Sequence, residues 1–190
     1  MNPYEIVGVT FGVVAVWLTT RQNVWCWPTG LVNVGLFIIV FGEARLYADM
    51  GLQVVYVVLC AYGWYEWLRG GPGHGRLAVS HGHPPVLGAL AALGAAGALA
   101  VGFLLHRHTD ASLPWVDAST TSYSLVAQWM QTRKWIENWV LWMVVDVVYI
   151  WMYISKGLLL TAGLYAIFLV LAVVGFVEWR RSLIRQARPS

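Results

Sequence analysis

The stretch WLTTRQNVWCW at residues 17–27 has a counterpart 112 residues later, WMQTRKWIENW at residues 129–139. At this offset, without gaps, Trp17 meets Trp129 and Trp27 meets Trp139. The same offset also pairs Thr20-Arg21 with Thr132-Arg133, Gly51-Leu52 with Gly163-Leu164, Gly63 with Gly175, Glu66-Trp67 with Glu178-Trp179 and Arg69 with Arg181. Shared hydrophobicity would not produce the matches of Trp, Arg and Glu. The sequence therefore predicts an internal duplication.

The composition is that of a membrane protein. Of the 190 residues, 59% are hydrophobic and 11% charged, whereas soluble domains carry about 25% charged residues. A bilayer can accommodate this apolar surface, and crossing it takes roughly 20 mainly apolar residues. Seven segments are predicted to span the membrane, at 4–19, 24–41, 47–68, 85–105, 114–131, 135–154 and 157–178.

The duplication and the number of spans together predict the topology. The first three spans match the last three, and a single span lies between them, so both copies enter the membrane in the same direction. Transporters built from such parallel repeats bind their ligand between the halves. We expect repeats at 1–69 and 114–181, a linker with the connecting helix at 70–113, and a tail at 182–190.

The distribution of basic residues predicts the orientation. One set of loops, which includes the C-terminal tail, holds nine of the twelve Lys and Arg residues, and the other set holds Arg45, Arg107 and Lys156. Basic loops remain in the cytoplasm. We therefore expect the C-terminus to be cytoplasmic and the N-terminus to lie outside.

The sixth span has a polar stripe at helical spacing, formed by Asn138, Trp142, Asp146, Tyr149 and Tyr153. Asp146 falls near the middle of the membrane, where an unpaired Asp costs about 2.5–3.5 kcal/mol. We therefore expect Asp146 to face the protein interior and to have a partner. A cationic substrate would serve, and so would a structural hydrogen bond to a neighbouring helix.

Other polar and aromatic groups fall inside the remaining spans. Asn33 lies on the second span at a depth similar to that of Asp146, where its amide would either bind a ligand or join two helices. Further candidates for ligand contacts are Gln53 and Tyr56 on the third span, Gln128 on the fifth and Tyr165 on the seventh. For each of these, packing is the alternative role.

Charged residues at the ends of the spans predict ion pairs. Glu137 is expected to pair with Arg133 or Lys134, Glu66 with Arg69, and Glu178 with Arg181. The five histidines lie in linkers without a supporting cluster of Cys or carboxylates, so no metal site is predicted. Because no nucleotide-binding loop or nucleophile triad occurs either, neither a cofactor nor an enzyme activity is expected.

Four segments resemble the Pnu family of bacterial vitamin transporters, above all its nicotinamide riboside carriers. They are WCWPTGLVNVGLF at 25–37, RLYADMGLQVVYV at 45–57, YGWYEW at 62–67 and TRKWIENWVLWMVVDV at 132–147. The resemblance covers nearly all of the chain outside the fourth span and the linkers. Its most specific part is the run around Glu137, Asn138, Trp139 and Trp142.

The resemblance implies an all-α membrane fold with seven helices in a 3+1+3, SWEET-like parallel repeat, assembled as a homotrimer. It also implies facilitated diffusion by alternating access, with a cytoplasmic kinase that traps the vitamin. We therefore expect a nicotinamide riboside uniporter of the bacterial inner membrane. Its site is expected to contain Asn138, Trp139, Trp142, Asp146, Tyr149, Asn33, Gln53, Tyr56, Gln128 and Tyr165. A thiamine carrier and a structural membrane scaffold are the alternatives.

Overall fold

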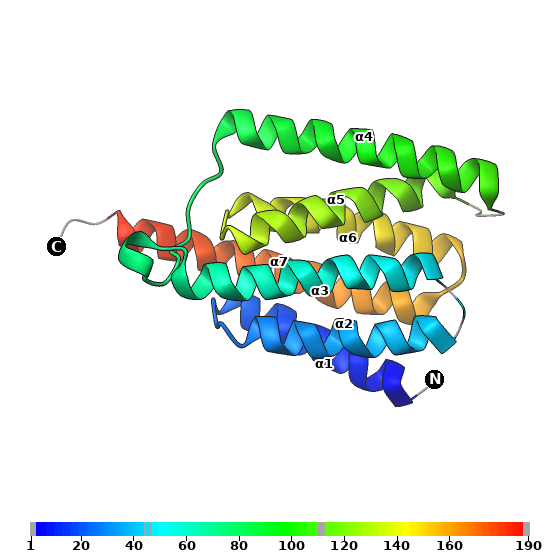
Figure 1. Cartoon of the computed structure of the whole chain (residues 1–190), viewed down its shortest axis with the longest axis horizontal. Coiled ribbons are helices and arrows are strands. Elements are labelled where there is room, and N and C mark those ends of the chain that lie inside the picture. Colours follow the sequence, from blue (N-terminus) through cyan, green and yellow to red (C-terminus); the bar gives the residue numbers. More distant parts are fainter. Residues whose placement is uncertain (1–2, 44, 46, 110–112, 188–190) are drawn as a thin grey trace. The chain divides into compact units, whose positions relative to one another are not determined.

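The regular elements of the computed structural model are all helices (Figure 1), and the model describes residues 3–43, 45, 47–109 and 113–187. The seven predicted spans are confirmed as long helices, with a short 3-10 helix, η1, in the linker. In chain order they are α1 (Pro3–Thr20), α2 (Cys26–Glu43), α3 (Tyr47–Arg69), η1 (Pro72–His74), α4 (Pro84–His108), α5 (Pro114–Thr132), α6 (Glu137–Ser155) and α7 (Leu159–Gln186). Only α7 ends well beyond its predicted limit.

Five of the described helices are long and apolar enough to cross a membrane, namely α1, α2, α4, α6 and α7. The helices α3 and α5 have the length of a span but contain more polar residues. Many large apolar side chains point outward, among them Leu160 at 88% exposure and Leu93 at 64%. Water would disfavour this surface, whereas the hydrocarbon of a bilayer accommodates it.

The backbone carries the duplication predicted from the sequence. At the offset of 112 residues, α1, α2 and α3 correspond to α5, α6 and α7, and each corresponding pair begins within one residue of the other. The turns correspond as well, because Gln22 and Lys134 have φ values of 55° and 51°. In the next turn, Arg45 and Gly157 have φ values of 58° and 72°. The two copies therefore share their helices and the conformation of their turns.

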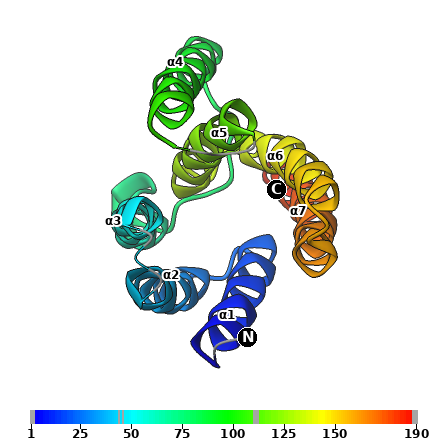
Figure 2. The same cartoon turned by 90° about the vertical axis from the view of Figure 1, so that its right-hand side faces the viewer.

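The chain divides into two compact units, and the first contains α1, α2 and α3 together with Thr132–Lys134 and the chain from Val174 onward. Within it, α2 packs against both α1 and α3 (Figure 2). The Nδ2 of Asn33 on α2 donates a hydrogen bond to the Gly8 carbonyl of α1 at 2.7 Å. On α3, Gly63 lies so close to the Trp27 ring that a Cβ there would clash with it.

The second unit consists of Ser80–Gln131 and Trp135–Val173. In it α4 packs closely on α5 through small residues, because Gly94 lies against Tyr123 and Gly102 lies against Trp115. The Ser122 hydroxyl donates to the Gly94 carbonyl at 2.8 Å. The Ala- and Gly-rich sequence of the connecting helix thus serves close packing against the second repeat.

Candidate substrate site

The first turn of α6 buries a polar group next to a large aromatic one. Asn138 and Trp139 are 0% and 1% exposed. The Nδ2 of Asn138 donates a hydrogen bond to the Trp135 carbonyl. Its Oδ1 is also buried and has no hydrogen-bond partner in the part of the chain that the structure describes. A buried amide oxygen without a partner is costly, so this atom is an acceptor available to a ligand.

Asp146 lies two turns further along α6 and is 3% exposed. Within the described ranges it has neither a hydrogen bond nor an ion pair. Trp142, one turn before it, is half-buried. Burying a carboxylate costs free energy unless it is paired or neutralised. This stretch of α6 therefore combines a carboxylate in need of a partner with an indole ring.

Tyrosines gather where α6 meets α7. The ring centroids of Tyr149 and Tyr165, both predicted site residues, lie 4.5 Å apart. Tyr153 stacks on both, at 5.9 Å from Tyr149 and 5.3 Å from Tyr165. The sequence places Tyr153 on the same polar stripe, although Tyr153 was not among the predicted site residues. The cluster offers flat faces on which an aromatic ligand can stack.

Gln128 belongs to a buried polar stripe on α5. Thr120, Ser124 and Gln128, at steps of four, are 3%, 5% and 9% exposed. The hydroxyls of Thr120 and Ser124 donate to carbonyls of their own helix, and Gln128 has the longest side chain of the three. Sequence reasoning missed the two hydroxyl residues, and their spacing from Gln128 was the available signal.

Three predicted site residues lie in the first unit. The amide nitrogen of Asn33 is engaged by Gly8, which is the helix-to-helix contact that the sequence also allowed. Gln53 and Tyr56 on α3 are half-buried. The other seven predicted residues all lie in the second unit.

A cluster of indole rings lies in the first unit, at the end of α3. The ring of Trp67 is 5.3 Å from that of Trp27 and 5.9 Å from that of Trp179. The Lys134 ammonium lies 4.3 Å from the Trp67 centroid and donates to the Leu77 carbonyl at 2.8 Å. Trp67 and Trp179 occupy equivalent positions in the two copies, so this part of the repeat is packing scaffold.

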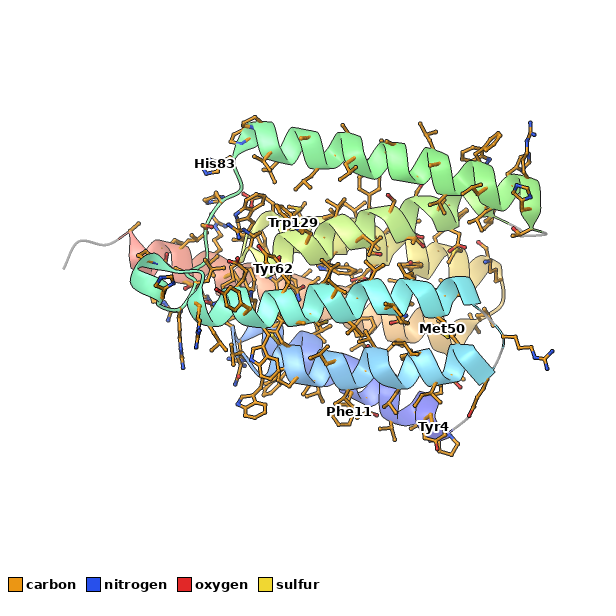
Figure 3. The ribbon with its side chains drawn as sticks, viewed as in Figure 1. Tyr4, Phe11, Met50, Tyr62, His83 and Trp129 are labelled. Atoms are coloured by element: carbon orange, nitrogen blue, oxygen red, sulfur yellow. The ribbon has the colours of Figure 1, made fainter. Side chains whose placement is uncertain are left out.

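Two of the predicted ion pairs are wrong. Arg133 pairs with Glu66 at 3.1 Å and donates to the Tyr62 hydroxyl (labelled in Figure 3), so Glu66 does not need Arg69. With Arg133 and Lys134 both engaged elsewhere, Glu137 pairs instead with His81, at 2.8 Å. The third prediction is confirmed, because Glu178 and Arg181 pair at 2.9 Å.

A metal site would require a cluster of His, Cys, Asp or Glu side chains. Within the described segments, no group of three or more His, Cys, Asp or Glu is placed to hold a metal ion. Apart from Glu137, which pairs with His81, the chemistry of the region around α6 is that of indole and phenol rings, the Asp146 carboxylate and two amides. Such a surface suits a flat, hydrogen-bonding and positively charged organic molecule.

Comparison with known proteins decides the family. The model of the nicotinamide mononucleotide transporter family matches residues 2–181. The chain belongs to this family. It is therefore a multi-pass membrane protein of a family of vitamin transporters, as the resemblance of the four sequence segments indicated.

Two relatives and one solved structure illustrate the range of the family. The riboflavin/roseoflavin transporter RibM of Streptomyces davaonensis is 30% identical over 192 residues, which cover 97% of this chain and 88% of RibM. The nicotinamide riboside transporter PnuC of Escherichia coli is 27% identical over 94% of this chain and 85% of its own length. A crystal structure of the vitamin B3 transporter PnuC matches with a TM-score of 0.74 at 24% identity, covering 97% of this chain and 84% of that one. This last match confirms the predicted fold.

Proposed function

We propose that the protein is a uniporter that carries nicotinamide riboside into the bacterial cytoplasm by alternating access. The observation that carries this proposal is Asp146, a buried carboxylate for which the described residues provide no partner. Nicotinamide riboside has a permanently charged pyridinium ring. Its positive charge would supply the missing partner, and its flat ring would suit the aromatic side chains around it.

The energetics favour a cation over a neutral ligand. An Asp at the centre of a membrane helix costs about 2.5–3.5 kcal/mol, and a cation bound beside it recovers part of that cost. A cation over an indole face gains roughly 0.5–2 kcal/mol more. Trp142 and Trp139 are the proposed rings, and the Asn138 oxygen is the proposed acceptor for a ribose hydroxyl or the carboxamide.

Six further residues are proposed as ligand contacts. Tyr149, Tyr165 and Gln128 belong to the same unit, and Asn33, Gln53 and Tyr56 are proposed from the first unit. With the Asn33 nitrogen engaged by Gly8, its oxygen is the atom left for a ligand. The C-terminus is proposed to face the cytoplasm, where a vitamin kinase would trap the product, and the chain is proposed to work as a homotrimer.

Riboflavin is the second candidate, because RibM is 30% identical and PnuC of Escherichia coli 27%. Riboflavin is flat and rich in hydrogen-bonding groups, but it is uncharged. In that case Asp146 would accept a hydrogen bond from the flavin or its ribityl chain instead of pairing with a cation. Thiamine, like nicotinamide riboside, is an aromatic cation and would use the same chemistry.

The test is calorimetric titration of the purified protein with nicotinamide riboside, thiamine and riboflavin in parallel. The proposal predicts binding of nicotinamide riboside and a loss of at least about tenfold in its affinity in Asp146→Asn, which keeps the shape and removes the charge. The separate variant Trp142→Ala should also weaken the binding of nicotinamide riboside. Binding of riboflavin alone would move the function to the second candidate. Unchanged nicotinamide riboside affinity in folded Asp146→Asn and Trp142→Ala would reject the proposed site.

A further inference from the structure

A short part of the linker lies against the turn that precedes α6. We call residues Ser80–Gly82 the strap. Ser80 and Trp135 form an isolated parallel bridge, in which the Ile136 N–H donates to the Ser80 carbonyl at 3.0 Å. The linker then enters α4 just after His83 (labelled in Figure 3).

Glu137, the first residue of α6, completes the attachment. Its Oε2 accepts a hydrogen bond from the Gly82 N–H at 3.0 Å, and its Oε1 lies 2.8 Å from Nδ1 of His81. One carboxylate thus binds two successive residues of the strap. Such charge-assisted hydrogen bonds are about twice as strong as neutral ones.

The packing around the strap leaves it little freedom. Gly82 is buried, and a Cβ on it would lie 2.7 Å from the Leu87 side chain and 2.8 Å from the Trp135 ring. Trp135 also packs against Trp129, whose ring stands edge-on to it at 5.4 Å. The close contact requires glycine at position 82 and fixes the strap against the turn.

The turn that the strap holds also orients the Asn138 side chain. Its Nδ2 donates to the carbonyl of Trp135, the residue that the strap holds. This hydrogen bond directs the Nδ2 of Asn138 toward the turn and its Oδ1 away from it. The Oδ1, buried and without a partner among the described residues, is thereby kept as the acceptor.

The equivalent turn of the first copy is closed in a different way. There the side chain of Asn23 accepts a hydrogen bond from the Trp25 N–H at 3.0 Å, a local cap that needs no distant segment. Trp25 is the counterpart of Glu137 at the offset of 112, and it is 65% exposed. A charged residue bound by a strap has thus taken the place of an exposed indole, at the position next to Asn138.

We propose that the strap holds the first turn of α6 fixed throughout transport, and that Glu137 is a positioning residue that aims the Asn138 carboxamide oxygen at the substrate. The part that concerns the substrate rests on the proposed function. The role of the strap does not depend on the substrate, because it follows from contacts within the chain.

The experiment compares Glu137→Ala with Glu178→Ala, a matched control that removes the same side chain from the ion pair with Arg181 on α7. Hydrogen–deuterium exchange of peptides covering residues 135–139 is measured first, without ligand. Titration with nicotinamide riboside follows. We expect faster exchange and an affinity about tenfold weaker in Glu137→Ala, and neither change in Glu178→Ala.

A conservative variant separates positioning from general stability. Glu137→Gln retains an oxygen that accepts the Gly82 N–H and should recover most of the affinity, to within about threefold of the wild type. If Glu137→Ala fails to fold, His81→Ala removes only the exposed half of the contact and should shift exchange and affinity in the same direction by less.

The outcomes for the strap and for the substrate are distinguishable. Unchanged exchange at 135–139 in Glu137→Ala would overturn the strap. Faster exchange with unchanged affinity would overturn the positioning role of Glu137. If the wild type binds no vitamin, the proposed function fails, and the exchange data still decide whether the strap holds the turn.

Discussion

The helices α2 and α6 occupy the same place in the two copies, and they differ in chemistry far more than in structure. Trp27 and Trp139 are both 1% exposed, and both helices follow a turn with a left-handed residue at the equivalent position, Gln22 or Lys134. Yet Asp146 on α6 corresponds to Val34 on α2, and both positions are buried. Likewise, Asn138 corresponds to Cys26.

This difference suggests how a duplicated fold acquires a function. The groups that keep the helices together are common to both copies, among them the indoles at 67 and 179 and the threonines at 20 and 132. The buried polar groups of α6 have no counterparts on α2, where the one buried-facing amide, Asn33, serves helix packing. We therefore regard the first copy chiefly as scaffold and the second as the main carrier of ligand chemistry.

The largest effect is expected from giving the first copy the carboxylate of the second. Val34→Asp places an unpaired carboxyl at mid-membrane on α2, at a position that is not one of the proposed ligand contacts. It should lower the free energy of unfolding by about 2.5–3.5 kcal/mol. Thermal unfolding in detergent measures this, with Val34→Asn as the uncharged control. Equal stability of Val34→Asp and the wild type would mean that α2 also provides a partner for a charge.

Gly63→Ala tests the scaffold that the copies share. The added methyl group would overlap the buried Trp27 ring, and overpacking of this kind costs about 1–3 kcal/mol. Gly51 on the same helix has nothing within 4 Å of its Cβ position, so Gly51→Ala should be neutral or stabilising by up to about 1 kcal/mol. The melting temperatures of the two variants should therefore move apart, and a common shift would contradict the packing.

Lys134→Gln gives the second turn the residue of the first, Gln22. Burial lowers the pKa of the Lys134 ammonium from 10.5 to about 8. Between pH 8 and pH 10.5 the Lys134 amine is protonated in the unfolded chain and neutral in the folded one. The free energy of unfolding of the wild type therefore rises as pH increases from 8. The contacts with Trp67 and Leu77 favour the charged amine and limit the gain to about 2 kcal/mol. The free energy of unfolding, measured between pH 7 and 10, should therefore rise more in the wild type than in Lys134→Gln. The same pH dependence in both proteins would contradict this prediction.

The smallest effect is expected from the local cap of the first copy. Asn23→Ala removes the acceptor of the Trp25 N–H and should cost about 1 kcal/mol of stability. Because the proposed ligand contacts at a helix start belong to α6, vitamin affinity should not change. A calorimetric titration of Asn23→Ala beside Glu137→Ala compares the two ways of closing the same turn. A loss of affinity in Asn23→Ala would show that the first copy also positions the ligand.

The sequence was sufficient to predict the helices and their duplication. Apolar segments long enough to span a membrane indicate transmembrane helices directly. Matching residues such as Glu66-Trp67 and Glu178-Trp179 established the offset of 112 residues between the two copies. The polar stripe on α6 was also visible, because helical spacing alone places Asn138 and Asp146 on one face.

Contacts between segments distant in sequence were not predictable in this way. Glu137 was expected to pair with its neighbours Arg133 and Lys134, but it binds His81, which lies 56 residues earlier. Nothing in the spacing of the linker indicates that it returns to the start of α6. Which cation pairs with Glu137 depends on which cations already pair with other helices. Arg133 pairs with Glu66 on α3.

The most direct test of the central claim replaces the two polar groups of α6 by their counterparts on α2. The variant Asn138→Cys with Asp146→Val removes the polar chemistry with a small change in side-chain volume, and its folding is checked by circular dichroism and melting temperature. Nicotinamide riboside is then titrated into this variant and into the wild type by calorimetry. We predict binding to the wild type and no measurable binding to the folded variant. Equal affinity for both proteins would contradict the assignment of ligand chemistry to the second copy.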